Sequence, residues 1–178
     1  SGTANFPGGL NVNGGRDVLN GGNLGPPGCG IYMANMGSGG TFCGTGHVAN
    51  YVSHNYGILA PGHSPGALSI GGRYDQGANA TLQIELGGKK PGTEYDQLVV
   101  AENADVAGTL DVSFWDGYAP AGGERFDVIL SGSVTNAFSA TNLPALTPGL
   151  EWLVFYRTNG VQLRVKSPTD SDGDGLAD

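Results

Sequence analysis

The sequence predicts an all-β protein, in particular a short right-handed parallel β-helix closed by a more antiparallel β cap. Three observations lead to this prediction. No long stretch keeps apolar residues at helical spacing without an intervening glycine or proline. Several short segments alternate apolar and polar residues, which is typical of half-buried strands. Asn-Gly and Gly-Gly pairs between the segments indicate the sharp corners of a β-solenoid, since glycine adopts positive φ angles at no steric cost.

The clearest strand signals have a period of two residues. Leu82, Ile84 and Leu86 fall on one side of their segment, with polar residues between them on the other side. Leu110, Val112 and Phe114 repeat this pattern. The segments predicted as strands are Val48–Val52, Ala67–Ile70, Ala80–Leu86, Gln97–Ala101, Thr109–Trp115, Arg125–Leu130, Leu150–Arg157 and Val161–Val165.

Composition divides the chain into three regions. Residues 1–72 are rich in glycine and asparagine and are expected to form the first solenoid turns. Residues 73–166 carry longer apolar segments and most of the aromatic residues, and are expected to continue the solenoid and to cap it. Residues 167–178 form an acidic linker.

One segment of the chain resembles the passenger domains of bacterial autotransporters. It runs from Gly44-Thr45-Gly46-His47-Val48 to Gly57-Ile58-Leu59-Ala60-Pro61-Gly62-His63-Ser64-Pro65-Gly66-Ala67-Leu68-Ser69-Ile70. The strands that follow, up to about residue 165, are similar to those that close such β-helices. The resemblance implies a β-helical architecture and carries little information about a ligand. Because an acidic linker follows the matched segment, we expect a secretion route other than autotransport.

The last nine residues predict a calcium loop. Asp170, Asp172, Asp174 and Asp178 stand at positions 1, 3, 5 and 9, and a glycine stands at position 6. Hard cations need several converging oxygen ligands, and the backbone carbonyl of Leu176 would supply another at position 7. This string is similar to the calcium loops of thrombospondin type-three repeats. Because the acid expected at position 12 is missing, we expect a downstream segment or a neighbouring molecule to complete the site. The alternative is an acidic tail that binds no ion.

Charge and composition point to an extracellular protein. The net charge is −8, and only eight residues are Lys or Arg. This disfavours nucleic acid and anionic membranes as partners, because phosphate groups are bound by clustered cations. No apolar run is long enough to span a bilayer. The chain begins at Ser1 without a signal peptide, so we expect that a leader or upstream segment was removed.

The two cysteines are expected to pair in such an environment. A disulfide between Cys29 and Cys43 would close a short loop and contribute about 3 kcal/mol to the free energy of unfolding. The alternative is a pair of buried thiols. Two cysteines without nearby histidines at ligand spacing do not form a zinc site.

A candidate ligand platform follows the strand that ends near residue 115. Trp115, Asp116 and Tyr118 combine aromatic faces, which stack on sugar rings, with a carboxylate that accepts hydrogen bonds from sugar hydroxyls. Trp115 is in phase with polar Asp111 and Ser113, which favours exposure. The alternative is that Trp115 covers the end of the solenoid.

Other patterns give little support for catalysis. No paired acids, nucleophile elbow or zinc-protease motif is present. Most acids occupy the polar phase of a strand, so we expect a protein that is not an enzyme, although a polysaccharide-degrading enzyme stays a minor alternative. The three histidines, His47, His54 and His63, are expected to lie in exposed loops.

Self-association is a further expectation. The segment 150–157 is apolar on both faces, so it is either fully sandwiched or offers a pairing surface to another subunit. Residues 1–30 contain few core residues of their own and would fold by docking onto a neighbour. The sequence therefore predicts a secreted structural or adhesive module that assembles with itself or with neighbouring domains, and a carbohydrate-binding module is the alternative.

Overall fold

The computed structural model describes residues 3–4, 11–12, 15–24, 35–36 and 39–167, and these residues contain strands and no helix. None of the described segments could therefore cross a membrane as a long apolar helix. The predicted all-β class is confirmed. The strands are β1 (Thr3–Ala4), β2 (Asn11–Val12), β3 (Gly15–Leu24), β4 (Asn35–Met36), β5 (Gly40–Val48), β6 (Val52–Pro61), β7 (Ala67–Ile70), β8 (Tyr74–Leu86), β9 (Gln97–Val100), β10 (Asn103–Val106), β11 (Thr109–Phe114), β12 (Arg125–Leu130), β13 (Ser133–Asn136), β14 (Ala140–Asn142), β15 (Glu151–Arg157) and β16 (Gly160–Lys166).

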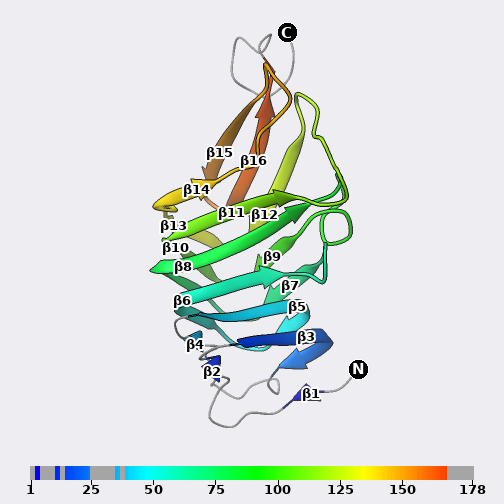
Figure 1. The fold of residues 1–178 in the computed structure, drawn as a ribbon. Coiled ribbons are helices and arrows are strands. Elements are labelled where there is room, and N and C mark those ends of the chain that lie inside the picture. Colours follow the sequence, from blue (N-terminus) through cyan, green and yellow to red (C-terminus); the bar gives the residue numbers. More distant parts are fainter. Residues whose placement is uncertain (1–2, 5–10, 13–14, 25–34, 37–38, 168–178) are drawn as a thin grey trace.

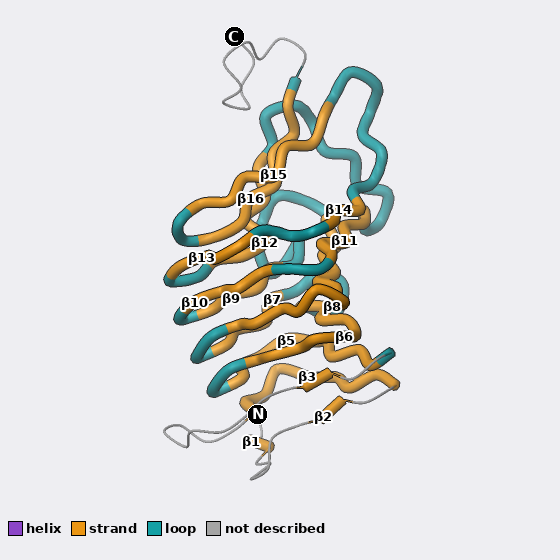
Figure 2. The backbone as a smooth tube through the Cα atoms, turned by 90° about the vertical axis from the view of Figure 1, so that its left-hand side faces the viewer, coloured by secondary structure: helices purple, strands orange, loops and turns teal. Residues whose placement is uncertain are grey.

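Most strands pair in parallel and form three series of stacked strands (Figures 1 and 2). The first series contains β3, β5, β6, β8, β11 and β14. The second contains β1, β3, β5, β7, β9 and β12. The third contains β6, β8, β10 and β13. From β6 to β14 the chain enters these series in a constant order, so that each strand lies on one formed about 17–31 residues earlier.

The core lies between the three series. In the first series Leu59 pairs with Leu82, and Leu82 pairs with Leu110. All three side chains are fully buried. In the second series Val48, Ile70 and Val100 are paired in the same way and are buried. Because side chains alternate between the two faces of a strand, this in-register pairing stacks one apolar residue on the next through the molecule.

Among the described strands, antiparallel pairing involves β16, the last strand, and its two neighbours. β16 pairs antiparallel with β12 and with β15, and it extends the sheet beyond the second series. Trp152 of β15 packs against Phe114 and Phe126 at centroid distances of 6.3 and 6.2 Å. The opposite face of β15 carries Phe155, whose ring is covered by the guanidinium of Arg164 at 3.9 Å. Thus β15 is sandwiched only in part, and no described strand pairs with its outer edge.

The predicted strands agree with the structure in most places, with one clear error and one extension. The predicted strand Val48–Val52 is wrong, because residues 49–51 form a corner between β5 and β6. Its apolar ends are both buried, but they belong to different strands. Parallel pairing also continues to residues 140–142, well beyond the first half of the chain.

A chain of polar groups crosses this apolar interior. The side chain of His54 is fully buried, and its Nε2 lies 2.7 Å from the hydroxyl of Tyr74. The Tyr74 hydroxyl donates to Oε1 of Gln76 at 2.8 Å, and Gln76 donates to the carbonyl oxygens of Ala80 and Thr109. This order makes His54 Nε2 the donor to Tyr74. Nδ1 of His54 then carries the lone pair, and no described residue donates to it.

The titration of His54 gives a testable pH dependence. Burial lowers the pKa of His54 from 6.5 to about 3. The unfolded chain therefore binds a proton between pH 6.5 and 3 that the folded protein excludes, so stability falls as the pH is lowered through this window. We expect His54 to contribute a loss of about 4 kcal/mol in the free energy of unfolding between pH 7 and 3.

Urea titrations of the wild type and of His54→Gln across this range measure the effect. Comparison with the variant isolates the contribution of His54. The buried carboxyl of Asp96, whose pKa is raised, stabilises the folded state as the pH falls, but it does so in both proteins and cancels in their difference. The free energy of unfolding of the wild type, minus that of the variant, should fall by about 4 kcal/mol as the pH is lowered from 7 to 3. A difference that stays constant from pH 7 to 3 would show that His54 is not held neutral.

Candidate functional site

The outward face of the first series carries a row of polar side chains. On β8, Gln83 and Glu85 alternate with the buried leucines and isoleucine, and on β11, Asp111 and Ser113 do the same. Gln83 is in register with Asp111, and Glu85 is in register with Ser113. The Gln83 side chain donates to Asp111 Oδ2 at 3.2 Å. The apolar pattern that builds the core therefore also aligns these polar groups outside it.

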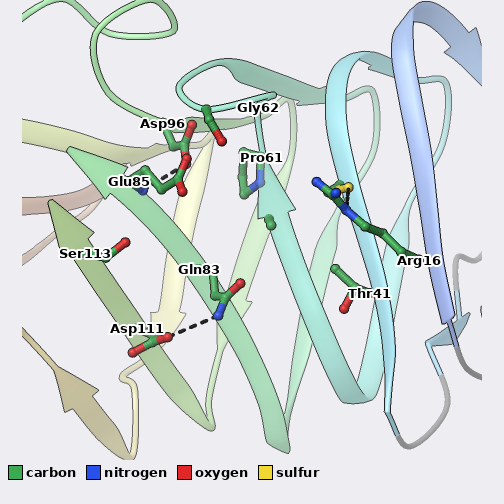
Figure 3. Close-up of a pocket in the computed structure, with 12 residues that line it drawn as sticks. Arg16, Thr41, Pro61, Gly62, Gln83, Glu85, Asp96, Asp111 and Ser113 are labelled. Atoms are coloured by element: carbon green, nitrogen blue, oxygen red, sulfur yellow. Dashed lines mark hydrogen bonds between the residues drawn. The ribbon is translucent and has the colours of Figure 1, made fainter. Parts of the chain in front are cut away.

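These side chains line a groove of about 360 Å³ (Figure 3). Gln83, Glu85, Asp111 and Ser113 form one side of the groove. Arg16 of β3 and Thr41 of β5 lie at the other side. Pro61 and Gly62, at the end of β6, border it at the level of Asp96. The groove thus combines carboxylates, an amide, hydroxyls and one guanidinium.

Asp96 anchors the corner at one end of the groove. Its Oδ1 accepts a hydrogen bond from the backbone N–H of Gly66 at 2.7 Å, and its Oδ2 accepts one from the N–H of Glu85 at 2.8 Å. The side chain is only 2% exposed. The carboxylate therefore joins the corner between β6 and β7 to strand β8.

Glycines allow this close approach. Gly62 has a φ of +98°, and a Cβ there would lie 2.3 Å from Asp96 Oδ1. A Cβ on Gly66 would lie 2.7 Å from the Cα of Gly62. Both distances are far below van der Waals contact, so the backbone requires glycine at both positions. The Pro-Gly-His-Ser-Pro-Gly sequence thus forms a compact corner around a buried carboxylate.

The environment of Asp96 shifts its titration toward neutral pH. Burial raises the pKa of Asp96 to about 7, and the charge of Glu85 acts in the same direction. The two backbone N–H donors lower it and so oppose the effect of burial. Asp96 therefore holds the corner as a hydrogen-bond acceptor, while Glu85 and Asp111 present their carboxylates to the groove.

The residues of the predicted aromatic platform lie in different environments in the structure. Trp115 directly follows β11 and is 42% exposed, as its phase in the sequence predicts. Its neighbour Asp116 lies in a turn with a φ of +51°. Tyr118 instead packs edge-on against Phe114 and Phe126, and its hydroxyl donates to Glu124. Burial raises the pKa of the Tyr118 hydroxyl well above its usual value. Of the two aromatic residues, Trp115 is exposed and Tyr118 is partly buried.

The predicted metal and disulfide sites lie outside the described residues. Asp170, Asp172, Asp174, Leu176 and Asp178 belong to segment 168–178, and Cys29 belongs to segment 25–34. The calcium loop and the Cys29–Cys43 disulfide therefore stay predictions. Cys43 itself is buried on β5 and accepts a hydrogen bond from Nε of Arg16 at 3.1 Å. Within the described part of the chain, no three acidic, histidine or cysteine side chains converge as metal ligands.

The histidines differ from the sequence prediction. His63 is exposed as expected, but His54 is fully buried and His47 bonds to the hydroxyl of Ser69 at 2.9 Å. The prediction of exposed loops was wrong for His54, which lies on β6 inside the core with Nε2 bonded to Tyr74. It was also wrong for His47, which lies partly buried on β5. The sequence also gave no indication of Asp96 or Arg16 as groove residues, although the two prolines and two glycines after Ala60 do indicate a fixed corner.

Comparisons with known proteins add no family assignment. A scan against protein-family models finds no match, and a search of curated proteins finds no similar sequence.

Replacement of Asp96 by asparagine tests the role of the buried carboxylate. Asparagine keeps one oxygen but turns an NH₂ group toward a backbone N–H donor, which leaves a buried polar group without a partner. We expect Asp96→Asn to lower the free energy of unfolding by about 1–3 kcal/mol, measured by urea titration at pH 8.

The matched control is Asp111→Asn, which makes the same substitution at an outward position. We expect it to change stability by less than about 0.5 kcal/mol. Equal stabilities of the two variants would contradict the anchoring role of Asp96.

Proposed function

We propose that this protein is a non-catalytic, extracellular structural or adhesive module built as a short right-handed parallel β-helix. The observation that carries the proposal is the constant order in which the chain enters the three series of parallel strands. A chain that winds in this way buries one continuous apolar core and forms an elongated, stiff body. Such a body suits a spacer or stalk that holds other domains apart.

The position of the acidic side chains supports a role without catalysis. Asp111 and Glu85 occupy the polar positions that alternate with core residues, which is where any solvated strand places its charges. Asp96, the acid with the most strongly shifted pKa near the groove, is already used by two backbone hydrogen bonds.

We further propose that the C-terminal loop binds Ca²⁺ outside the cell. The spacing of Asp170, Asp172, Asp174 and Asp178 supports this, together with a net charge of −8. Extracellular calcium modules bind with dissociation constants of about 10⁻⁴ to 10⁻³ M. The ion would therefore be bound in extracellular fluid and would stiffen the junction between the β-helix and whatever follows it.

Assembly with a second copy or a neighbouring domain is part of the same proposal. The outer edge of β15 pairs with no described strand, so its N–H and C=O groups are open to strand addition. Phe155 and the half-exposed Tyr156 on this strand would give such an interface apolar contacts.

A carbohydrate-binding module is the second candidate function. The specific observation in its favour is Trp115, because a large exposed indole on a rigid strand end is a ready surface for the apolar face of a sugar ring.

Replacement of Asp172 by alanine tests the calcium loop. We expect Asp172→Ala to abolish calorimetric Ca²⁺ binding and to leave the circular dichroism spectrum unchanged, because the substitution alters none of the strand residues up to Lys166. The control is Glu102→Ala, which removes one negative charge at an exposed position outside the loop and should bind Ca²⁺ like the wild type. Unchanged binding by Asp172→Ala would refute the site.

Particle size tests the assembly proposal. In millimolar Ca²⁺ we expect light scattering to report particles larger than the 18.1 kDa monomer, and we expect chelator to reduce their size. Negative-stain microscopy should show the elongated shape. A monomer under both conditions would overturn the assembly proposal and leave the spacer role to be tested within a longer chain.

A further inference from the structure

Trp115 comes two residues after Ser113, which lines the groove, at the end of the same strand. Two register pairs, Gln83 with Asp111 and Glu85 with Ser113, continue toward the ends of β8 and β11. Gly87 lies directly after β8 and Trp115 lies directly after β11, and the backbone N–H of Trp115 donates to the carbonyl of Leu86 at 2.8 Å. The indole therefore follows directly on the row of polar side chains that lines the groove.

Gly87 leaves room for the side chain of Trp115. A Cβ at position 87 would lie 3.1 Å from Cδ1 and 3.3 Å from Cβ of Trp115. The absence of a side chain therefore lets Trp115 lie close against the backbone of β8. Trp115 keeps 42% of its surface exposed, so part of the indole is available for stacking.

The chemistry of the groove favours a ligand that is rich in hydroxyl groups. Asp111 and Glu85 accept hydrogen bonds, Arg16 donates them, and Gln83 and Ser113 can do both. Sugar hydroxyls also donate and accept, so a sugar can satisfy such a mixed set. The two outward carboxylates outnumber the single guanidinium, which disfavours an anionic polysaccharide such as a polyuronate.

We infer that the groove and Trp115 form one binding site for a neutral oligosaccharide, with the indole stacking on one sugar ring and the groove binding the hydroxyls of the adjoining rings. This inference rests on the second candidate function and extends it from a single exposed aromatic residue to a site with several subsites. The site lies along the strand ends of β8 and β11 and reaches β3 and β5.

Calorimetry and affinity electrophoresis with defined oligosaccharides test the inference. The probes are the neutral hexasaccharides cellohexaose, xylohexaose and mannohexaose, with hexagalacturonate as the anionic probe. We expect at least one neutral hexasaccharide to bind and hexagalacturonate not to bind.

Two groups of variants separate the parts of the site. Trp115→Ala removes the stacking surface, and the double variant Asp111→Ala with Ser113→Ala removes groove contacts. We expect each to weaken binding at least tenfold, and we expect Trp115→Phe to recover part of the affinity. Tyr56→Ala is the matched control, because Tyr56 is 47% exposed but lies on β6 and does not line the groove. Its affinity should equal that of the wild type. Circular dichroism and urea titration confirm that each variant is folded.

The outcomes distinguish failure of the extension from failure of the candidate function. If Trp115→Ala loses binding while the Asp111→Ala, Ser113→Ala double variant binds like the wild type, the combined site is overturned and only a simple aromatic platform is left. Equal weakening by Tyr56→Ala would overturn it as well, because binding would then reflect exposed aromatic residues in general. If no neutral hexasaccharide binds, both the combined site and the carbohydrate-binding function are wrong, whereas the spacer proposal is unaffected.

Discussion

In-register pairing of parallel strands is the constraint on which the rest of this structure depends. The backbone N–H and C=O groups of each strand form hydrogen bonds with the neighbouring strands of the stack. This pairing fixes which side chains lie on top of one another. With Leu59, Leu82 and Leu110 in register, the apolar row on the inner face is continuous. The burial of this row supplies much of the free energy that holds strands far apart in sequence together. A shift by one residue would turn the same leucines to solvent, so the core also determines the register.

The corners must be as well defined as the strands for this pairing to persist. Between β6 and β7 the chain turns at a glycine that no side chain could replace, and the buried carboxylate of Asp96 joins this turn to β8. Asp96 stands 30 residues after Gly66, so one turn of the chain is fixed by a residue from the next. This contact links a local sequence motif to long-range packing. It also explains why a charged residue is tolerated at a position with almost no exposure.

The sequence was sufficient to predict strands where a local pattern carried the information. Ala67–Ile70 and Arg125–Leu130 agree with β7 and β12 residue for residue, because alternation and flanking glycines mark their ends. It was not sufficient where the information lies in partners far along the chain. Val48 and Val52 look like one strand in the sequence, but they are buried on two strands on either side of a corner. The ring of His54 is buried where Tyr74 accepts its hydrogen bond and in turn donates to Gln76. The groove was missed for the same reason, since its residues come from β3, β5, β6, β8 and β11.

The same register that builds the core also places chemistry on the outside. Because side chains alternate, an inner row of leucines requires an outer row, and the residues of that row are free to vary without loss of packing. Along β8 and β11 the outer row holds Gln83 beside Asp111 and then Glu85 beside Ser113. Gly87 and Trp115 follow directly after the two strands. A rigid surface with evenly spaced positions of this kind can present different groups at intervals set by the backbone alone. The spacer and carbohydrate-binding proposals are therefore compatible, because the parallel pairing that forms the core also fixes the positions of the groove residues on β8 and β11.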